Sequence, residues 1–211
     1  MSGSDAAADP TGWFEPLYAA AERGETVVPW DRGAPNPLLV EWTTAHDLGP
    51  AGRRALVVGS GLGDDAEHIA SLGFATVAFD ISPTAIRSAR RRFPDSPVDY
   101  VVADLLDAPP EWERAFDLVV ENITVQALPA SVRPSAIAAI SGMVAPGGTL
   151  VVISGARDAG DDVDGPPWPL TRTEVESFAT GGVEAVRIEE LARPFGPWAK
   201  SWRAEFRRPA P

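Results

Sequence analysis

One stretch, residues 55–80, constrains the fold more than any other part of the chain. It opens with four apolar residues, which have the length and composition of a strand buried on both faces. Glycines follow at Gly59, Gly61 and Gly63, and glycine allows backbone to turn tightly and to approach a ligand closely. A helical pattern and a second apolar run complete the stretch, which ends on Asp80. We therefore expect a strand–helix–strand unit of a nucleotide-binding sheet.

The residues around the glycine loop narrow the choice of ligand. Asp80 lies 21 positions after Gly59, and an acid about 20 positions after the loop holds a ribose hydroxyl pair in such units. A dinucleotide loop has the spacing G-x-G-x-x-G, because phosphates contact bare backbone at a helix N-terminus. Here the third glycine comes one residue early and is followed by Asp64 and Asp65. These carboxylates would repel a pyrophosphate and favour S-adenosylmethionine, which carries an ammonium, a sulfonium and no phosphate. A purely structural turn is the alternative.

The rest of the chain continues to alternate strands with helices. This order predicts a doubly wound α/β sheet of seven strands, with a mainly parallel core and one antiparallel strand at its edge. In such sheets a ligand lies at the carboxyl ends of the strands. The further expected elements are helices over 82–93, 131–143 and 171–179, and strands over 100–103, 116–120, 149–153, 183–191 and 202–207.

The first fifty residues lie before the alternating strands and helices. Residues 1–10 are small and polar, and we expect them to be disordered. Aromatic residues then recur at helical spacing, and Pro37 starts a second helix that should end at Gly49-Pro50. We expect residues 11–50 to form a helical lid on a single domain that spans 11–211.

Composition and charge exclude several classes of protein. The chain has no cysteine, which excludes disulfides, thiolate zinc sites and cysteine nucleophiles. The net charge is −12, so a nucleic-acid partner is not expected. No apolar run approaches the roughly 20 residues of a membrane span, and the N-terminus lacks a signal pattern. We expect a cytoplasmic protein without a membrane partner or a metal, and we interpret the acidic loop at 158–164 as solvated.

Several motifs between residues 56 and 153 accompany the acid Asp80. They read LVVGSGLGDDA, FDIS, DLL, FDLVVEN and APGGTLVVI. Together they resemble the class I S-adenosylmethionine-dependent methyltransferases, which implies a Rossmann-like fold with this methyl donor as cofactor. PWDRGAPNPLL, GLGDDA and ITVQALPASVRPSAI resemble, more narrowly, the thiopurine, thiol and halide methyltransferase branch. The chain departs from these patterns at Val57, Ser60 and Glu121-Asn122, where relatives commonly place an acid, a cysteine and an aspartate.

The resemblance assigns most site residues. It implies that the glycine loop contacts the methionine part and ribose, that Asp80 holds the ribose, and that Ile81 and Asp104 meet the adenine. Trp13 and Trp30 are expected to close over the cofactor, since ring faces attract a sulfonium, and lid packing is the alternative. The predicted cofactor-binding set is Trp13, Trp30, Gly59, Ser60, Gly61, Gly63, Asp65, Asp80, Ile81, Asp104, Leu105 and Glu121, and the predicted acceptor-binding set is Asp31, Gln126, Arg133 and Trp198.

These assignments predict methyl transfer to a small-molecule acceptor. A soft nucleophile such as a thiol ranks ahead of oxygen or nitrogen acceptors, because a thiolate needs no strong base and the chain has only two histidines. No catalytic residue is assigned. A nicotinamide-dependent reductase and a protein that binds S-adenosylmethionine without turnover remain the alternatives. The protein is expected to be a monomer or a homodimer.

Overall fold

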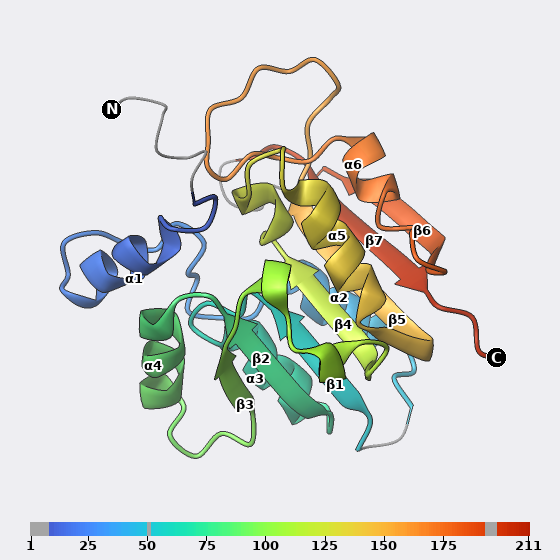
Figure 1. Ribbon diagram of the computed structural model, residues 1–211, viewed down its shortest axis with the longest axis horizontal. Coiled ribbons are helices and arrows are strands. Elements are labelled where there is room, and N and C mark those ends of the chain that lie inside the picture. The colour runs from blue at the N-terminus through green and yellow to red at the C-terminus, as the bar shows by residue number, and fades with distance from the viewer. Residues whose placement is uncertain (1–8, 50–51, 193–197) are drawn as a thin grey trace.

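A computed structural model describes residues 9–49, 52–192 and 198–211, and in them a seven-stranded sheet of order β3-β2-β1-β4-β5-β7-β6 (Figure 1). The first five strands in the chain pair in parallel. This confirms the predicted doubly wound sheet with its mainly parallel core. The strands are β1 (Arg54–Val58), β2 (Ala75–Asp80), β3 (Asp99–Val102), β4 (Phe116–Asn122), β5 (Val144–Gly155), β6 (Glu184–Leu191) and β7 (Ser201–Arg207).

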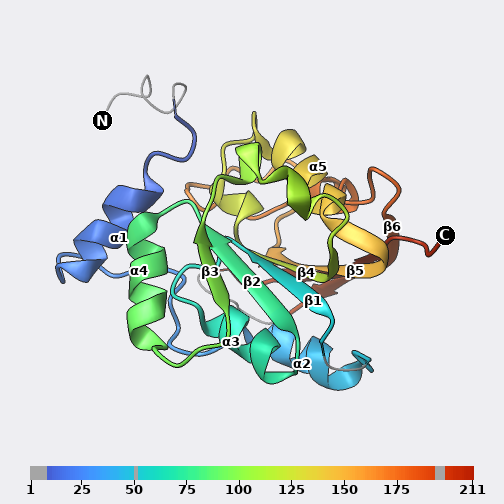
Figure 2. The same ribbon diagram turned by 60° about the horizontal axis from the view of Figure 1, so that its bottom comes forward.

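Helices cover both faces of this sheet. Figure 2 shows α5 on one face, α2 and α3 on the other, and α1 alongside α4 near the β3 edge. The lid helix α1 thus lies beyond the carboxyl ends of the first strands. The helices are α1 (Phe14–Glu22), α2 (Pro37–Ala45), α3 (Asp64–Ser71), α4 (Pro83–Arg92), α5 (Arg133–Gly142) and α6 (Arg172–Glu176), with 3-10 turns η1 (Leu105–Asp107), η2 (Pro110–Trp112) and η3 (Val125–Ala127).

The antiparallel strand does not lie at the edge, so that expectation was wrong. β7 pairs antiparallel with both β5 and β6 and therefore lies between them. Along β7, Trp202, Ala204 and Phe206 are buried, whereas no residue of β6 is fully buried. Burial of apolar surface favours β7 next to the core, and it leaves the polar β6 at the edge.

Two element boundaries differ from the expectations by four or more residues. α2 ends at Ala45, before the predicted Gly49, because the His46 ring stacks on Trp42 at 4.4 Å and its Nε2 lies 3.1 Å from a Glu205 carboxylate oxygen on β7. β5 begins at Val144, before the predicted start at 149, since the Pro-Gly-Gly segment continues the strand past an irregularity in its pairing with β4.

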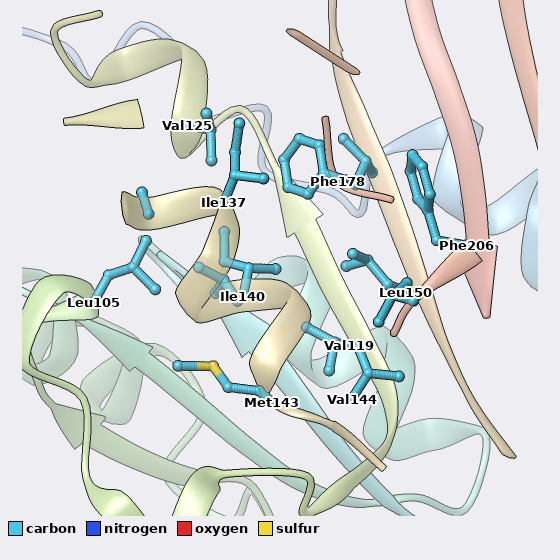
Figure 3. Close-up of a cluster of buried hydrophobic side chains, with 14 of the residues drawn as sticks. Leu105, Val119, Val125, Ile137, Ile140, Met143, Val144, Leu150, Phe178 and Phe206 are labelled. Atoms are coloured by element: carbon cyan, nitrogen blue, oxygen red, sulfur yellow. The ribbon is translucent and has the colours of Figure 1, made fainter. Parts of the chain in front are cut away.

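The larger part of the core lies between the sheet and α5 (Figure 3). Ile137 and Ile140 of α5, with the C-cap residue Met143, belong to one cluster with Val119 of β4 and Leu150 of β5. A second buried cluster lies on the opposite face, under α2, α3 and α4. Packing on both faces holds the parallel strands in place and therefore places their carboxyl ends side by side.

Replacement of Ile140 by alanine should destabilise the fold. Ile140 is completely buried, so Ile140→Ala should lower the free energy of unfolding by about 2–5 kcal/mol through lost burial and a residual cavity. Val186→Ala is the matched control, because Val186 is 56% exposed on β6 and exposed changes cost about 0.5 kcal/mol or less. Urea titration followed by circular dichroism measures the free energy of unfolding of both variants. An equal decrease in the two variants would contradict the described core.

Candidate functional site

Two adjacent clefts open at the carboxyl ends of β1, β2 and β4. The first, which we call the apolar cleft, encloses about 620 Å³ and reaches from the lid to β3. The second, the loop cleft, encloses about 580 Å³ along the glycine loop. Both clefts are lined by Trp30, Gly59, Asn122 and Ile123. The site predicted at this end of the sheet is therefore a continuous concave surface with a mostly apolar half and a polar half.

Asp80, the last residue of β2, is the charged centre of the apolar cleft. It is 5% exposed. Its Oδ2 accepts a hydrogen bond from the Gly61 N–H at 3.0 Å, and its Oδ1 accepts one from the Ser82 N–H at 2.9 Å. Burial raises the pKa of Asp80 to about 6, although these N–H donors lower it. Each carboxylate oxygen keeps acceptor capacity beyond one hydrogen bond, so the oriented group can also accept from a pair of hydroxyls.

Side chains of the lid and of the turn after β4 pack directly against the glycine loop. A Cβ at Gly59 would overlap the side chain of Thr124, and one at Gly61 would lie 2.9 Å from the Tyr18 hydroxyl. Both glycines have positive φ, 57° and 53°, where a side chain is also sterically disfavoured. Glycine is required here because other elements pack directly onto the loop backbone.

A partly buried contact between a carboxylate and two hydroxyls connects the lid helix α1 to the start of α4. The Glu15 carboxylate accepts hydrogen bonds from the Ser82 hydroxyl at 2.5 Å and from the Thr84 N–H at 3.1 Å and hydroxyl at 2.5 Å. Burial raises the pKa of Glu15, but these bonds outweigh it and lower the pKa below its usual value. This contact sets the lid's aromatic residues Phe14 and Tyr18 on the wall of the apolar cleft.

Trp30 lines both clefts and contacts two residues of helix α1. Its Nε1 donates to the Tyr18 hydroxyl at 2.9 Å, and its ring meets Phe14 edge-on at a centroid distance of 6.4 Å. Trp13 stacks on Phe14 at 4.1 Å but lines neither cleft within the described residues. Of the two tryptophans predicted to close over the cofactor, Trp30 therefore lines the site and Trp13 supports its wall.

Asp65 ties the strap, which we define as residues 27–36, to the sheet. Its two oxygens accept from the Asn36 backbone N–H and from the Asn122 side-chain amide, each at 2.7 Å. Asn36 also donates to the Asn122 Oδ1 at 2.9 Å and caps α2 by accepting from the Leu38 N–H at 2.9 Å. Burial raises the pKa of Asp65, and the two hydrogen bonds lower it. Asp65, which lines the loop cleft, thus connects the strap to the end of β4.

Most of the predicted cofactor residues meet at the two clefts. Asp104 both lines the apolar cleft and caps η1, since its side chain accepts from the Leu106 N–H at 2.8 Å. Trp30, Gly59, Asp80, Ile81, Asp104 and Leu105 line the apolar cleft, and Ser60, Gly61, Gly63 and Asp65 line the loop cleft. Their contact with a cofactor stays a prediction.

Glu121 lies beneath the site instead of on its surface. It is fully buried near the end of β4 and lines neither cleft in the described part of the chain. Its Oε1 accepts from the Val125 N–H at 2.9 Å. Burial raises the pKa of Glu121 to about 7, against the lowering effect of backbone N–H donors at Val125 and Thr124.

Of the predicted acceptor residues, only Asp31 lines a cleft, the loop cleft, among the residues described. Gln126 is fully buried, and its Oε1 accepts from the Gly155 N–H at 2.6 Å. Arg133 is buried and pairs with Glu174 of α6, and the Trp198 ring lies against Gly155. Their predicted role in acceptor binding remains a prediction.

Sequence reasoning did not place Phe14, Tyr18, Asn36, Asn122 or Thr124 in the site. Asn36 before Pro37 is a recognisable helix start and gave a usable signal. Phe14 and Tyr18 belong to a helical pattern that equally fits packing on the domain. Nothing near Thr124 in the sequence indicates contact with Gly59.

The residues present fit S-adenosylmethionine. Asp80 offers a buried acceptor for ribose hydroxyls, while Ile81 and Leu105 offer apolar surface on the same cleft. Within the described ranges, three acids, Asp31, Asp64 and Asp65, and one cation, Arg32, line the loop cleft. Arg92 pairs with Asp31 at 3.6 Å and with Asp64 at 2.9 Å. The acids still outnumber these cations, which suits an ammonium or sulfonium and opposes a pyrophosphate. A glycine loop packed under the lid gives the close backbone approach that such a ligand needs.

Comparisons with known proteins agree with this site. The methyltransferase domain family matches residues 55–148. Probable thiol methyltransferase 2 of Arabidopsis thaliana is 32% identical over 189 residues, which cover 88% of this chain and 79% of the relative. Thiocyanate methyltransferase 1 of Arabidopsis thaliana is 31% identical over 171 residues, with 79% and 73% covered.

Solved structures share the fold. A protein solved in a study of the conversion of a disulfide bond into a thioacetal group during echinomycin biosynthesis has a TM-score of 0.73, 26% identity and 93% coverage of both chains. Magnesium protoporphyrin IX methyltransferase from Synechocystis PCC 6803, solved with bound S-adenosylmethionine, has a TM-score of 0.71 at 12% identity and covers 99% of this chain and 100% of its own. The second likeness concerns the fold alone.

Replacement of Asp80 should weaken cofactor binding in a pH-dependent way. Asp80→Asn should bind S-adenosylhomocysteine about 10–100-fold more weakly at pH 8, because hydrogen bonds to a charged group contribute about 1.5–3 kcal/mol. The wild-type affinity should decrease as the pH falls through about 6, where the free carboxyl takes up its proton. The variant should lack this step.

Calorimetric titration from pH 5 to pH 8.5 measures the effect. Asp107→Asn is the control, since Asp107 is exposed on η1, and it should bind like the wild type. Equal affinities for all three proteins would contradict the ribose role of Asp80.

Loss of the strap contact should affect both stability and binding. Asn36→Ala removes the α2 cap and the contact with Asn122, so it should lower the free energy of unfolding by about 1–2 kcal/mol and weaken S-adenosylhomocysteine binding. The control is Thr44→Ala, because Thr44 is exposed and its hydroxyl donates to the Val40 carbonyl within α2. Chemical denaturation measures the free energy of unfolding, and calorimetric titration measures binding. Equal results for Asn36→Ala and the control would contradict the described role of the strap contact.

Proposed function

Because this chain belongs to the family of thiol and thiocyanate methyltransferases, which are class I S-adenosylmethionine-dependent enzymes, we propose that it methylates the sulfur atom of a small organic thiol. The observation that carries the proposal is the match to a protein named as a probable thiol methyltransferase over 88% of this chain. That match extends well beyond residues 55–148, the part shared with methyltransferase domains in general.

In this proposal each cleft holds a different part of the cofactor. S-adenosylmethionine supplies an electrophilic methyl group on a positively charged sulfur. Asp80 would accept from the ribose hydroxyls, and Ile81 and Leu105 would pack on the adenine in the apolar cleft. The glycine loop and Asp31 would face the methionine part in the loop cleft. The reacting sulfur would then lie near Trp30 and Gly59, which line both clefts.

The remaining task of the protein is alignment and exclusion of water. Methyl transfer is an in-line displacement, so the acceptor lone pair must point along the S–CH3 bond. Phe14, Tyr18 and Trp30 form an aromatic wall over this region, which favours an apolar acceptor and keeps water out.

A thiol suits a site that has few side chains able to act as a general base. A thiol has a pKa near 8.5, so an appreciable fraction is ionised at mildly alkaline pH. Among the described residues that line the two clefts there is no histidine or lysine. A phenol would need a stronger base than these clefts offer, and this supports sulfur over oxygen. A neutral amine already carries a free lone pair, so the acceptor panel decides between sulfur and nitrogen.

An acceptor panel tests the proposal directly. Purified protein is incubated with S-adenosylmethionine and, separately, benzenethiol, an alkanethiol, thiocyanate, iodide, catechol and aniline. We expect mass spectrometry to show S-methyl products and S-adenosylhomocysteine with the organic thiols. Asp80→Asn should lower kcat/KM for the methyl donor about 10–100-fold, since a charge-assisted hydrogen bond is lost, whereas Asp107→Asn should not.

Other outcomes distinguish the alternatives. Methylation confined to catechol or aniline would overturn the sulfur acceptor but keep the methyltransferase assignment. Tight S-adenosylhomocysteine binding without turnover on any acceptor would indicate a binding protein instead. Hydride transfer with NADH, without binding of either adenosyl ligand, would indicate a reductase.

A further inference from the structure

Three buried polar atoms lie together without a protein partner. In the described part of the chain Glu121 Oε2, Gln126 Nε2 and Ser154 Oγ form no hydrogen bond to protein, and all three residues are 0% exposed. Buried polar groups in folded proteins are normally paired with protein or with ordered water. Three such groups in one region therefore indicate a bound polar partner.

The sheet register places the three groups on the same face. Glu121 of β4 is opposite Val152 of β5, and Ser154 lies two residues further along β5. Side chains two apart on a strand share a face, and Val152 belongs to the core cluster on the α5 face. Gln126 reaches the same place from η3, because its Oε1 accepts from the N–H of Gly155, next to Ser154.

These three residues lie beneath the turn that follows β4 and lines the two clefts. The second Glu121 oxygen, Oε1, holds the Val125 N–H at the start of η3. Thr124 lines the apolar cleft, and Ile123 lines both clefts. Ile123 has a φ of 68°, which is strained for a β-branched residue and persists only where the surroundings enforce it.

We propose that Glu121, Gln126 and Ser154 bind an internal water molecule and that Glu121, through this water and Val125, is the positioning residue of the turn 122–127. The chemistry of the three groups is complementary around one water. Glu121 Oε2 accepts, Gln126 Nε2 donates, and the Ser154 hydroxyl does either. Buried waters typically make about three hydrogen bonds.

A crystal structure of the wild-type protein, free and with S-adenosylhomocysteine, tests the water site. We expect a water within hydrogen-bond distance of Glu121 Oε2, Gln126 Nε2 and Ser154 Oγ in both forms. Direct bonding of Glu121 Oε2 to Gln126 Nε2, with no water between them, would overturn the proposal. Ser154→Val should displace the water, because it puts a methyl group in the place of the hydroxyl.

Glu121→Leu and Glu121→Gln test the positioning role. Leucine removes the carboxylate and leaves the buried Val125 N–H without its partner, so the unfolding midpoint should fall, and S-adenosylhomocysteine binding to the folded protein should weaken about tenfold because the turn loses its anchor. Glutamine keeps an oxygen for Val125 and an amide for the water, so it should restore most of the affinity. A merely structural role predicts a lower unfolding midpoint in Glu121→Leu with unchanged affinity, when binding is measured well below that midpoint.

The control is Glu111→Gln, since Glu111 is exposed on η2, and it should change neither quantity. Unchanged binding in Glu121→Leu would overturn the positioning role. The binding measurements rest on the proposed cofactor site, whereas the crystal structure of the free protein does not. If the wild type fails to bind S-adenosylhomocysteine, the proposed function fails and the water site is still decided by that structure.

Discussion

The packing of two side chains onto a glycine backbone is the contact on which the rest of this site depends. Thr124, just after β4, fills the space of a Cβ at Gly59, and Tyr18 of the lid fills that of a Cβ at Gly61. The Gly61 N–H in turn orients Asp80. A side chain at Gly59 would displace the turn after β4, and one at Gly61 would displace the lid and disturb the N–H that orients Asp80.

Three carboxylates near the carboxyl ends of the strands, the buried Asp80 and Glu121 and the half-buried Asp65, have different roles. Asp80 accepts from Gly61 and Ser82 and keeps capacity for a ligand. Asp65 is occupied by Asn36 and Asn122 and holds the strap. Glu121 holds the turn beneath both clefts. Burial raises the pKa of all three, so each needs N–H donors to carry a charge, and the identity of those donors separates ligand binding from scaffolding.

The sequence anticipated features that depend on local spacing. The glycine positions, the acid that ends β2 and the start of the helix expected from 171 are set by neighbouring residues. In the structure α6 begins at Arg172, with Thr171 and Glu174 forming a capping box at its start. Arg133 shows the limit. It belonged to the predicted acceptor-binding set, yet it pairs with Glu174, 41 positions away. No local pattern specifies such a partner, because the pairing depends on how α5 and α6 pack.

The alternation of strands and helices, the mainly parallel sheet and the edge of that sheet where the clefts open could be predicted from the amino-acid sequence. These follow from apolar periodicity and from glycine and proline at fixed positions, which act within a few residues. Long-range packing fixes three other features: β7 lies between β5 and β6, Asp65 holds the strap, and Glu121, Gln126 and Ser154 are left with unpartnered atoms beneath the turn. Those outcomes depend on burial and hydrogen-bond pairing between residues distant in the chain, which compete across the whole fold and leave no mark in a short segment.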